Sequence, residues 1–260
     1  MRAAPDRPRT SARLRSDQQP DERAIAVASL ALLAALAWLY LMLAPMPMPG
    51  SGGVASLPYA TFTFLMWLVM MVAMMTPAVT PVVLLFDRVQ RYPAGGSRGR
   101  TWAFIGGYFS AWAAFSLAVT VLQLLLIAIG WLDAMTVSQR VPLTGALLLA
   151  AGCYQWLPAK LACLEHCRGP VAFLARHYRA GIAGGWRMGL EHGIFCVGCC
   201  WLLMLLLFVG GVMNLLWIAA LTIVISVERL LARGDWLRRL MGTLLVLAGA
   251  GLLLHRLAPP

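Results

Sequence analysis

Residues 61–86 read TFTFLMWLVMMVAMMTPAVTPVVLLF and contain no charged side chain. A helix of about 20 consecutive apolar residues is long enough to cross the roughly 30 Å hydrocarbon core of a membrane. The stretch therefore predicts a membrane-spanning helix. Pro77 and Pro81 predict a kink that frees backbone carbonyls, which membrane helices tolerate where those carbonyls face a protein interior.

Six further apolar runs define the predicted fold. They cover residues 24–44, 102–129, 141–157, 192–209, 212–227 and 240–257. Gly210 and Gly211 are expected to separate the fifth span from the sixth. Because 61% of the chain is hydrophobic and only 12% is charged, a soluble globular protein is excluded. The runs also lack the alternation of a membrane barrel, so we predict an all-α, polytopic membrane bundle of about seven transmembrane helices.

Basic residues outside these runs set the predicted orientation. The 21 lysines and arginines fall almost entirely in alternate segments, and the positive-inside rule assigns such segments to the cytoplasm. This predicts a multi-pass protein of a bacterial inner membrane, with its amino terminus in the cytoplasm and its carboxyl terminus outside. The net charge of +11 is spread between the spans, which argues against nucleic acid as a partner.

Two parts of unequal size make up the chain. Residues 1–23 are rich in Arg, Pro, Asp, Ser and Gln and predict a disordered, basic cytoplasmic tail. Residues 24–257 predict a single transmembrane helical domain embedded in the lipid bilayer. The first apolar run is too long for the core of a signal peptide, so we expect it to be retained as an anchor.

The cysteines are gathered in one part of the chain. All six lie between Cys153 and Cys200, on the side of the membrane that is predicted to be cytoplasmic. That compartment is reducing, which favours thiolates and metal ligands over structural disulfides. Cys153, which stands alone, is better explained by packing.

One helical face in the fifth span carries the main candidate site. At about 100° per residue, Met188, His192, Cys196 and Cys199 form a stripe, and Cys200 lies beside it. Thiolate, imidazole and thioether together are the ligand set that Cu(I) prefers. Zn(II) is the alternative if the thioether takes no part.

The preceding loop supplies a second half of the candidate site. It contains Cys163, His166 and Cys167, and the two cysteines lie one turn apart if the segment is helical. We expect the two halves to meet at the cytoplasmic membrane surface. A glycine recurs at every fourth position from Gly185 to Gly193 and predicts the close approach of another helix.

Methionines form a row in the second predicted span. They are Met66, Met70, Met71, Met74 and Met75. Counting the helical rise from the predicted cytoplasmic ends puts Met74 and Met75 at about the depth of Cys196 to Cys200. Met70 and Met74 are therefore candidate weak ligands along a path for a soft cation. The alternative is that the methionines are only flexible core residues.

Few polar residues interrupt the spans. Gln123 and Gln155 lie within them, and Glu228 and Arg229 stand at the end of the sixth. Ionisable residues within a membrane are functional candidates by default. A glutamate followed by an arginine at the interface is also a simple anchoring pair, and this is what we expect of Glu228 and Arg229.

Three segments resemble a known family. They read MWLVMMVAMMTPAVTPVVLLF (66–86), YQWLPAKLACLEHCRGP (154–170) and RMGLEHGIFCVGCCWLLMLLLFVGGVMNLLWIAAL (187–221). Their order and spacing resemble the DUF2182 family of predicted metal-binding integral membrane proteins, most specifically from His192 to Trp201. The resemblance implies metal binding but does not name the metal.

Three functions are compatible with the sequence. The first is binding of a soft transition metal, foremost Cu(I), for homeostasis, delivery or transport, with a metal-donating or metal-accepting protein as partner. The second is a membrane thiol–disulfide oxidoreductase that uses Cys196, Cys199 and Cys200. The third is a non-catalytic membrane scaffold or assembly factor. No motif for ordinary enzyme catalysis is found.

Overall fold

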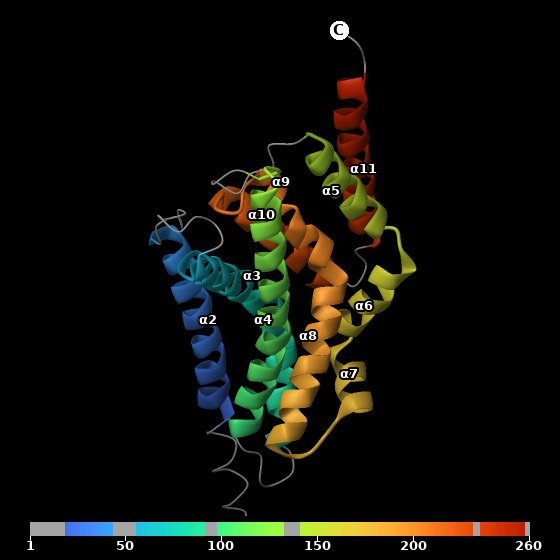
Figure 1. The fold of residues 1–260 in the computed structure, drawn as a ribbon. Coiled ribbons are helices and arrows are strands. Elements are labelled where there is room, and N and C mark those ends of the chain that lie inside the picture. Colours follow the sequence, from blue (N-terminus) through green and yellow to red (C-terminus); the bar gives the residue numbers. More distant parts are fainter. Residues whose placement is uncertain (1–18, 44–55, 92–97, 133–140, 231–234, 258–260) are drawn as a thin grey trace, which may run out of the picture.

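The computed structural model describes residues 19–43, 56–91, 98–132, 141–230 and 235–257, and this part of the chain is all-helical (Figure 1). The helices are α2 (Gln19–Leu43), α3 (Leu57–Arg91), α4 (Arg98–Ala128), α5 (Val141–Tyr154), α6 (Pro158–Arg168), α7 (Pro170–His177), α8 (Gly181–Leu205), α9 (Leu207–Gly210), α10 (Leu215–Leu230) and α11 (Asp235–Leu257). The predicted helical class is confirmed. Helix α2 begins within the predicted tail, most of which lies outside the described residues.

Among the described residues, five helices are long and apolar enough to cross a membrane. They are Ala24–Leu43, Leu57–Gln90, Gly99–Ala128, Gly181–Gly210 and Asp235–His255. Helices α5 and α6 are bent by 65° relative to each other and give a sixth span if the pair counts as one. The structure thus supports five or six spans, and the predicted seven are not confirmed.

Two local features account for the difference in span number. Leu157 is extended, with φ −70° and ψ 140°, because a residue that precedes proline disfavours the helical conformation. Helix α5 ends at Tyr154 and α6 begins at Pro158, so the helix is shorter than the predicted span 141–157. The predicted span 212–227 corresponds to α10, which has 16 residues. At 1.5 Å per residue it is about 24 Å long, shorter than the hydrocarbon core.

The predicted break after the fifth span is confirmed. Helix α9 ends at Gly210, and Gly211 follows with a φ of 91°. This left-handed conformation favours glycine, because it places a Cβ atom too close to the backbone. The chain therefore turns here between α8–α9 and α10.

Helices α4 and α8 cross at unusually short range. A Cβ atom on Gly189 would lie 1.9 Å from the carbonyl oxygen of Phe104, and one on Gly193 would lie 2.8 Å from that of Tyr108. From the other side, a Cβ on Gly107 would lie 2.0 Å from the Trp186 carbonyl oxygen. The glycine repeat of α8 thus makes the predicted helix contact, and it places the candidate site against α4.

Helix α3 runs through the interior and continues past Pro77 and Pro81. Its methionines are at most 4% exposed: Met66, Met70, Met71, Met74 and Met75. The indole nitrogen of Trp67 donates a hydrogen bond to Gln123 Oε1 on α4 at 2.7 Å. This buried bond gives Gln123, one of the few polar residues in the spans, a structural partner.

Buried charges join α6 to α10. Lys160 Nζ lies 2.8 Å from Glu228 Oε2, and both side chains are buried. Gln155 Nε2 donates to Glu228 Oε1 at 3.1 Å, and Arg168 Nε donates to the Glu228 backbone oxygen at 2.9 Å. Buried charges are tolerated when they are paired and hydrogen-bonded, so this network holds α6 and α10 together.

Candidate metal centre

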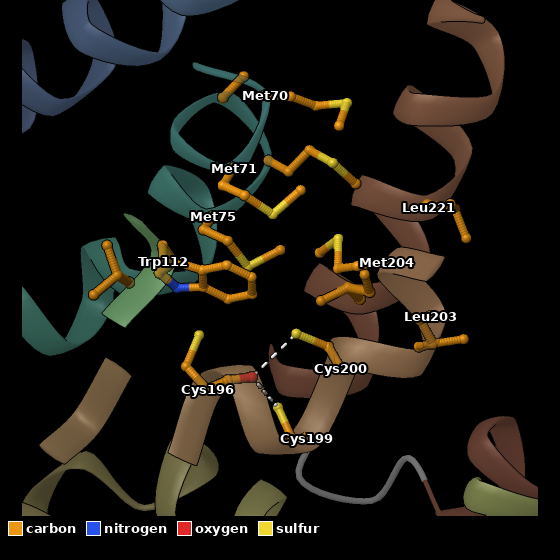
Figure 2. Packing of buried hydrophobic residues seen from close by; sticks show 14 of the residues in the cluster. Met70, Met71, Met75, Trp112, Cys196, Cys199, Cys200, Leu203, Met204 and Leu221 are labelled. Atoms are coloured by element: carbon orange, nitrogen blue, oxygen red, sulfur yellow. Dashed lines mark hydrogen bonds between the residues drawn. The ribbon is translucent and has the colours of Figure 1, made fainter. Parts of the chain in front are cut away.

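The cysteine-bearing face of α8 is turned into the protein. His192, Cys196, Cys199 and Cys200 are at most 2% exposed, and Met188 is fully buried. The stripe predicted from the helical period therefore lies on the buried side of one helix. Figure 2 shows the three cysteines on neighbouring turns of α8, below the methionines of α3.

Four thiols from two helices meet at this face. Cys199 Sγ and Cys200 Sγ both donate to the carbonyl oxygen of Cys196, at 3.1 and 3.0 Å. Cys196 Sγ lies 2.7 Å from the hydroxyl oxygen of Tyr108 on α4. The Cys167 thiol, from α6, lies near the thiols of Cys196 and Cys199. The structure thus brings one member of the predicted second half-site into contact with the first.

Arg229 on α10 completes the surroundings of the thiols. Its Nη2 donates to the Cys196 carbonyl oxygen at 3.0 Å and lies 3.1 Å from Cys199 Sγ and 3.5 Å from Cys200 Sγ. The expectation that Glu228 and Arg229 form an anchoring pair at the interface is therefore wrong. Both side chains are buried, and Glu228 pairs with Lys160 whereas Arg229 contacts the thiols. The only sequence signal for this role was the presence of charged residues within an apolar run.

His192 presents a nitrogen without a partner. Its Nδ1 is buried and has no hydrogen-bond partner among the described residues. Its ring is enclosed by those of Phe104, Tyr108 and Phe173, with centroid distances of 6.2, 5.9 and 5.0 Å. Buried polar groups are nearly always satisfied, so this nitrogen is consistent with a ligand that binds here.

The remaining residues of the predicted second half-site lie at its border. Cys163 is half-buried, and its sulfur would lie 3.0 Å from a Cβ on Gly198. His166 stacks on Phe195 at 4.2 Å, and its Nδ1 is hydrogen-bonded with Ala162 of its own helix at 2.8 Å. Neither joins the four thiols, although the segment is helical as expected.

The methionines share a buried cluster with the cysteines. Met70, Met71 and Met75 follow one another along α3 in Figure 2, and the Cys200 thiol points to their side of the view. Met204 on α8 belongs to the same cluster. The same buried core thus holds thioethers and thiols, and this arrangement is also that of an ordinary core.

The described residues hold no group of three or more His, Cys, Asp or Glu side chains in a metal-binding arrangement. In this arrangement the thiols of Cys199 and Cys200 both donate to the backbone carbonyl oxygen of Cys196. Cu(I) needs fewer ligands than a four-coordinate Zn(II) site.

An open pocket borders the centre on the side of α6 and α7. Glu165, His166, Phe173 and His177 are among its lining residues. Phe173 stacks on His177 at 4.9 Å and meets the ring of His192 edge-on at 5.0 Å. The pocket is therefore lined by Phe173, whose ring packs against that of His192.

Comparison with known proteins gives one family. No curated protein and no solved structure matches the chain significantly. A family model, PpoB2, described as a copper chaperone, matches residues 64–252 of the 260. That range includes all six cysteines and both helices of the α4–α8 crossing. Since the match covers well over half of the chain, the protein belongs to the PpoB2 copper chaperone family.

Proposed function

We propose that this protein is an integral membrane copper chaperone that binds Cu(I) at the thiols of α6 and α8 and passes it to an acceptor protein. The observation that carries the proposal is the meeting of four buried thiols beside an unpartnered imidazole nitrogen. Cu(I) prefers this soft set of ligands. Family membership supports copper and offers no support for Zn(II).

Ligand exchange explains how the ion enters and leaves such a site. Cys196, Cys199, Cys200 and Cys167 are the strong ligands, and His192 is the imidazole ligand. Two-coordinate Cu(I) moves by gaining a third ligand before it loses one of the first two. We propose that His166, which lines the open pocket, and Cys163, which lies beside Gly198 of α8, pass the ion inward from the surface.

The methionines offer a weaker path away from the thiols. We propose Met70 and Met74 as transient ligands, because thioethers bind Cu(I) without a charge and release it readily. Their burial beside the cysteines supports this role. Delivery to a partner on the far side of the membrane would follow this path along α3.

The membrane setting is part of the same proposal. Five long apolar helices support insertion in a bilayer, and the basic segments place the amino terminus in the cytoplasm of a bacterial inner membrane. If the segment of α5 and α6 also crosses the membrane, the thiols face a reducing compartment in this orientation. We also propose that the resemblance to the DUF2182 family reflects the same metal-binding architecture.

A thiol–disulfide oxidoreductase is the second candidate, because the Cys167 thiol contacts that of Cys199 across two helices. The two functions differ in what happens to the thiols in growing cells. A copper chaperone keeps them reduced and shields them from alkylation when copper is supplied. A disulfide population that turns over without metal would favour the oxidoreductase. A scaffold would show neither effect.

The proposal is tested by Cu(I) competition titrations against a colorimetric chelator on detergent-purified protein. Cys196→Ser or Cys199→Ser should remove most of the bound Cu(I), because each removes a central thiolate. Cys153→Ser is the matched control, since Cys153 is exposed and stands apart from the other thiols. Folded Cys196 and Cys199 variants that bind Cu(I) as the unmodified protein does would refute the site.

A further inference from the structure

A buried guanidinium adjoins the thiols without a carboxylate partner. Arg229 is 6% exposed, and arginine remains charged in proteins. The neighbouring carboxylate, Glu228, is paired with Lys160. Within the described part of the chain no carboxylate pairs with Arg229, and its Nε has no hydrogen-bond partner. The groups that its Nη2 contacts are one carbonyl oxygen and the sulfurs of Cys199 and Cys200.

A buried cation of this kind requires nearby negative charge. Burying an unpaired charge is costly, and attraction to an anion offsets that cost. The neutral pair of Lys160 and Glu228 supplies no net charge. The metal–thiolate centre is then the natural counter-charge for Arg229.

We propose that Arg229 sets the preference of the thiol centre for a monovalent soft ion over a divalent one. This inference rests on the proposed function. With any fixed set of thiolates, a Cu(I) or Ag(I) centre carries one more negative charge than a Zn(II) or Cd(II) centre. The guanidinium therefore stabilises the monovalent complex more, whichever of the thiolates coordinate.

The size of the effect follows from Coulomb's law. Two unit charges about 4 Å apart, at an effective dielectric of about 20, interact strongly enough to change an affinity by about a thousandfold. An ion bound farther from the guanidinium than the sulfurs would interact with it more weakly, which would reduce this value. We expect the ratio of monovalent to divalent affinity to fall at least about 30-fold when the charge is removed.

A purely structural role predicts a different result. Arg229 also ties α10 to α8 through the Cys196 carbonyl oxygen, and loss of that tie would weaken the binding of every metal alike. The ratio of the monovalent to the divalent affinity therefore distinguishes the effect of the charge from the effect of the hydrogen bond. Restoring the charge with lysine should restore the ratio even where the hydrogen-bond geometry is lost.

The experiment uses the full chain in mild detergent under anaerobic conditions. Affinities for Ag(I), Cu(I), Cd(II) and Zn(II) are measured by competition in Arg229→Met, Arg229→Gln and Arg229→Lys proteins. Both neutral variants should lower the monovalent-to-divalent ratio at least about 30-fold, and the lysine variant should stay within about threefold of the unmodified protein. Arg238→Met is the matched control, because Arg238 is buried but bonded to Gln155 rather than to the thiols.

Two results would overturn the role of Arg229. One is an unchanged ratio in either neutral variant that elutes as folded protein. The other, which needs no variant, is unmodified protein that binds Cd(II) as tightly as Ag(I). Unmodified protein without measurable Cu(I) binding would instead refute the proposed function itself, so the two failures are distinguishable.

Discussion

At the scale of single residues, each cysteine thiol of α8 takes part in a weak hydrogen bond. Cys199 and Cys200 donate to one carbonyl oxygen, and Cys196 faces the Tyr108 hydroxyl. Such a hydrogen bond contributes about 0.5–1.5 kcal/mol net, whereas metal binding to structural thiolate sites contributes about 10 kcal/mol or more. Metal binding of comparable strength at the proposed site would exceed the cost of turning the thiols toward the ion.

His192→Ala should lower Cu(I) affinity about tenfold, at the lower end of the losses seen when metal-site support is removed. The reason is that Nδ1 is buried without a partner and is available to the ion. X-ray absorption of the copper-loaded protein should show one nitrogen neighbour fewer in the variant. His177→Ala, which alters a ring in the bordering pocket, serves as the control. An unchanged copper spectrum would remove His192 from the ligand set.

At the scale of elements, the crossing of α4 and α8 determines where the site lies. The glycine repeat could be predicted from the sequence, because regular spacing along one helix is a local property. Cys196 and Cys199 were predicted on one face, with Cys200 beside it, for the same reason. The meeting of Cys167 with this face was expected, but the contact of Arg229 could not be predicted, because it depends on how α10 packs against α8.

Gly189→Ala should destabilise the protein by several kcal/mol and weaken Cu(I) binding, because its Cβ would lie 1.9 Å from the Phe104 carbonyl oxygen and overpacking of this kind separates the helices. Gly106→Ala is the control, since a Cβ there meets nothing within 4 Å. The measurement is thermal unfolding in detergent, followed by the same chelator competition. Equal melting temperatures for the two variants would contradict the close crossing.

At the scale of the whole molecule, the sequence predicted the helical class and most of the long apolar helices. The seven predicted spans are not confirmed, because the chain bends by 65° between α5 and α6 and α10 has only 16 residues. Lys160 and Glu228 cancel each other's charge in the interior, so the bend between α5 and α6 and the end of the short α10 can lie side by side within the protein. Hydropathy along a single segment does not reveal such pairing.

The topology can be tested with reporter fusions at four positions. An odd number of crossings would put the amino and carboxyl termini on opposite sides of the membrane, as the distribution of basic segments predicts. Together with the positive-inside rule, this predicts that the amino terminus and Gly95 are cytoplasmic, whereas Gly53 and the carboxyl terminus are outside. Gly53 and Gly95 on the same side would contradict the orientation on which the reducing environment of the thiols depends. A cytoplasmic carboxyl terminus, with Gly53 and Gly95 still on opposite sides, would instead show that α5 and α6 form one span within a six-span protein.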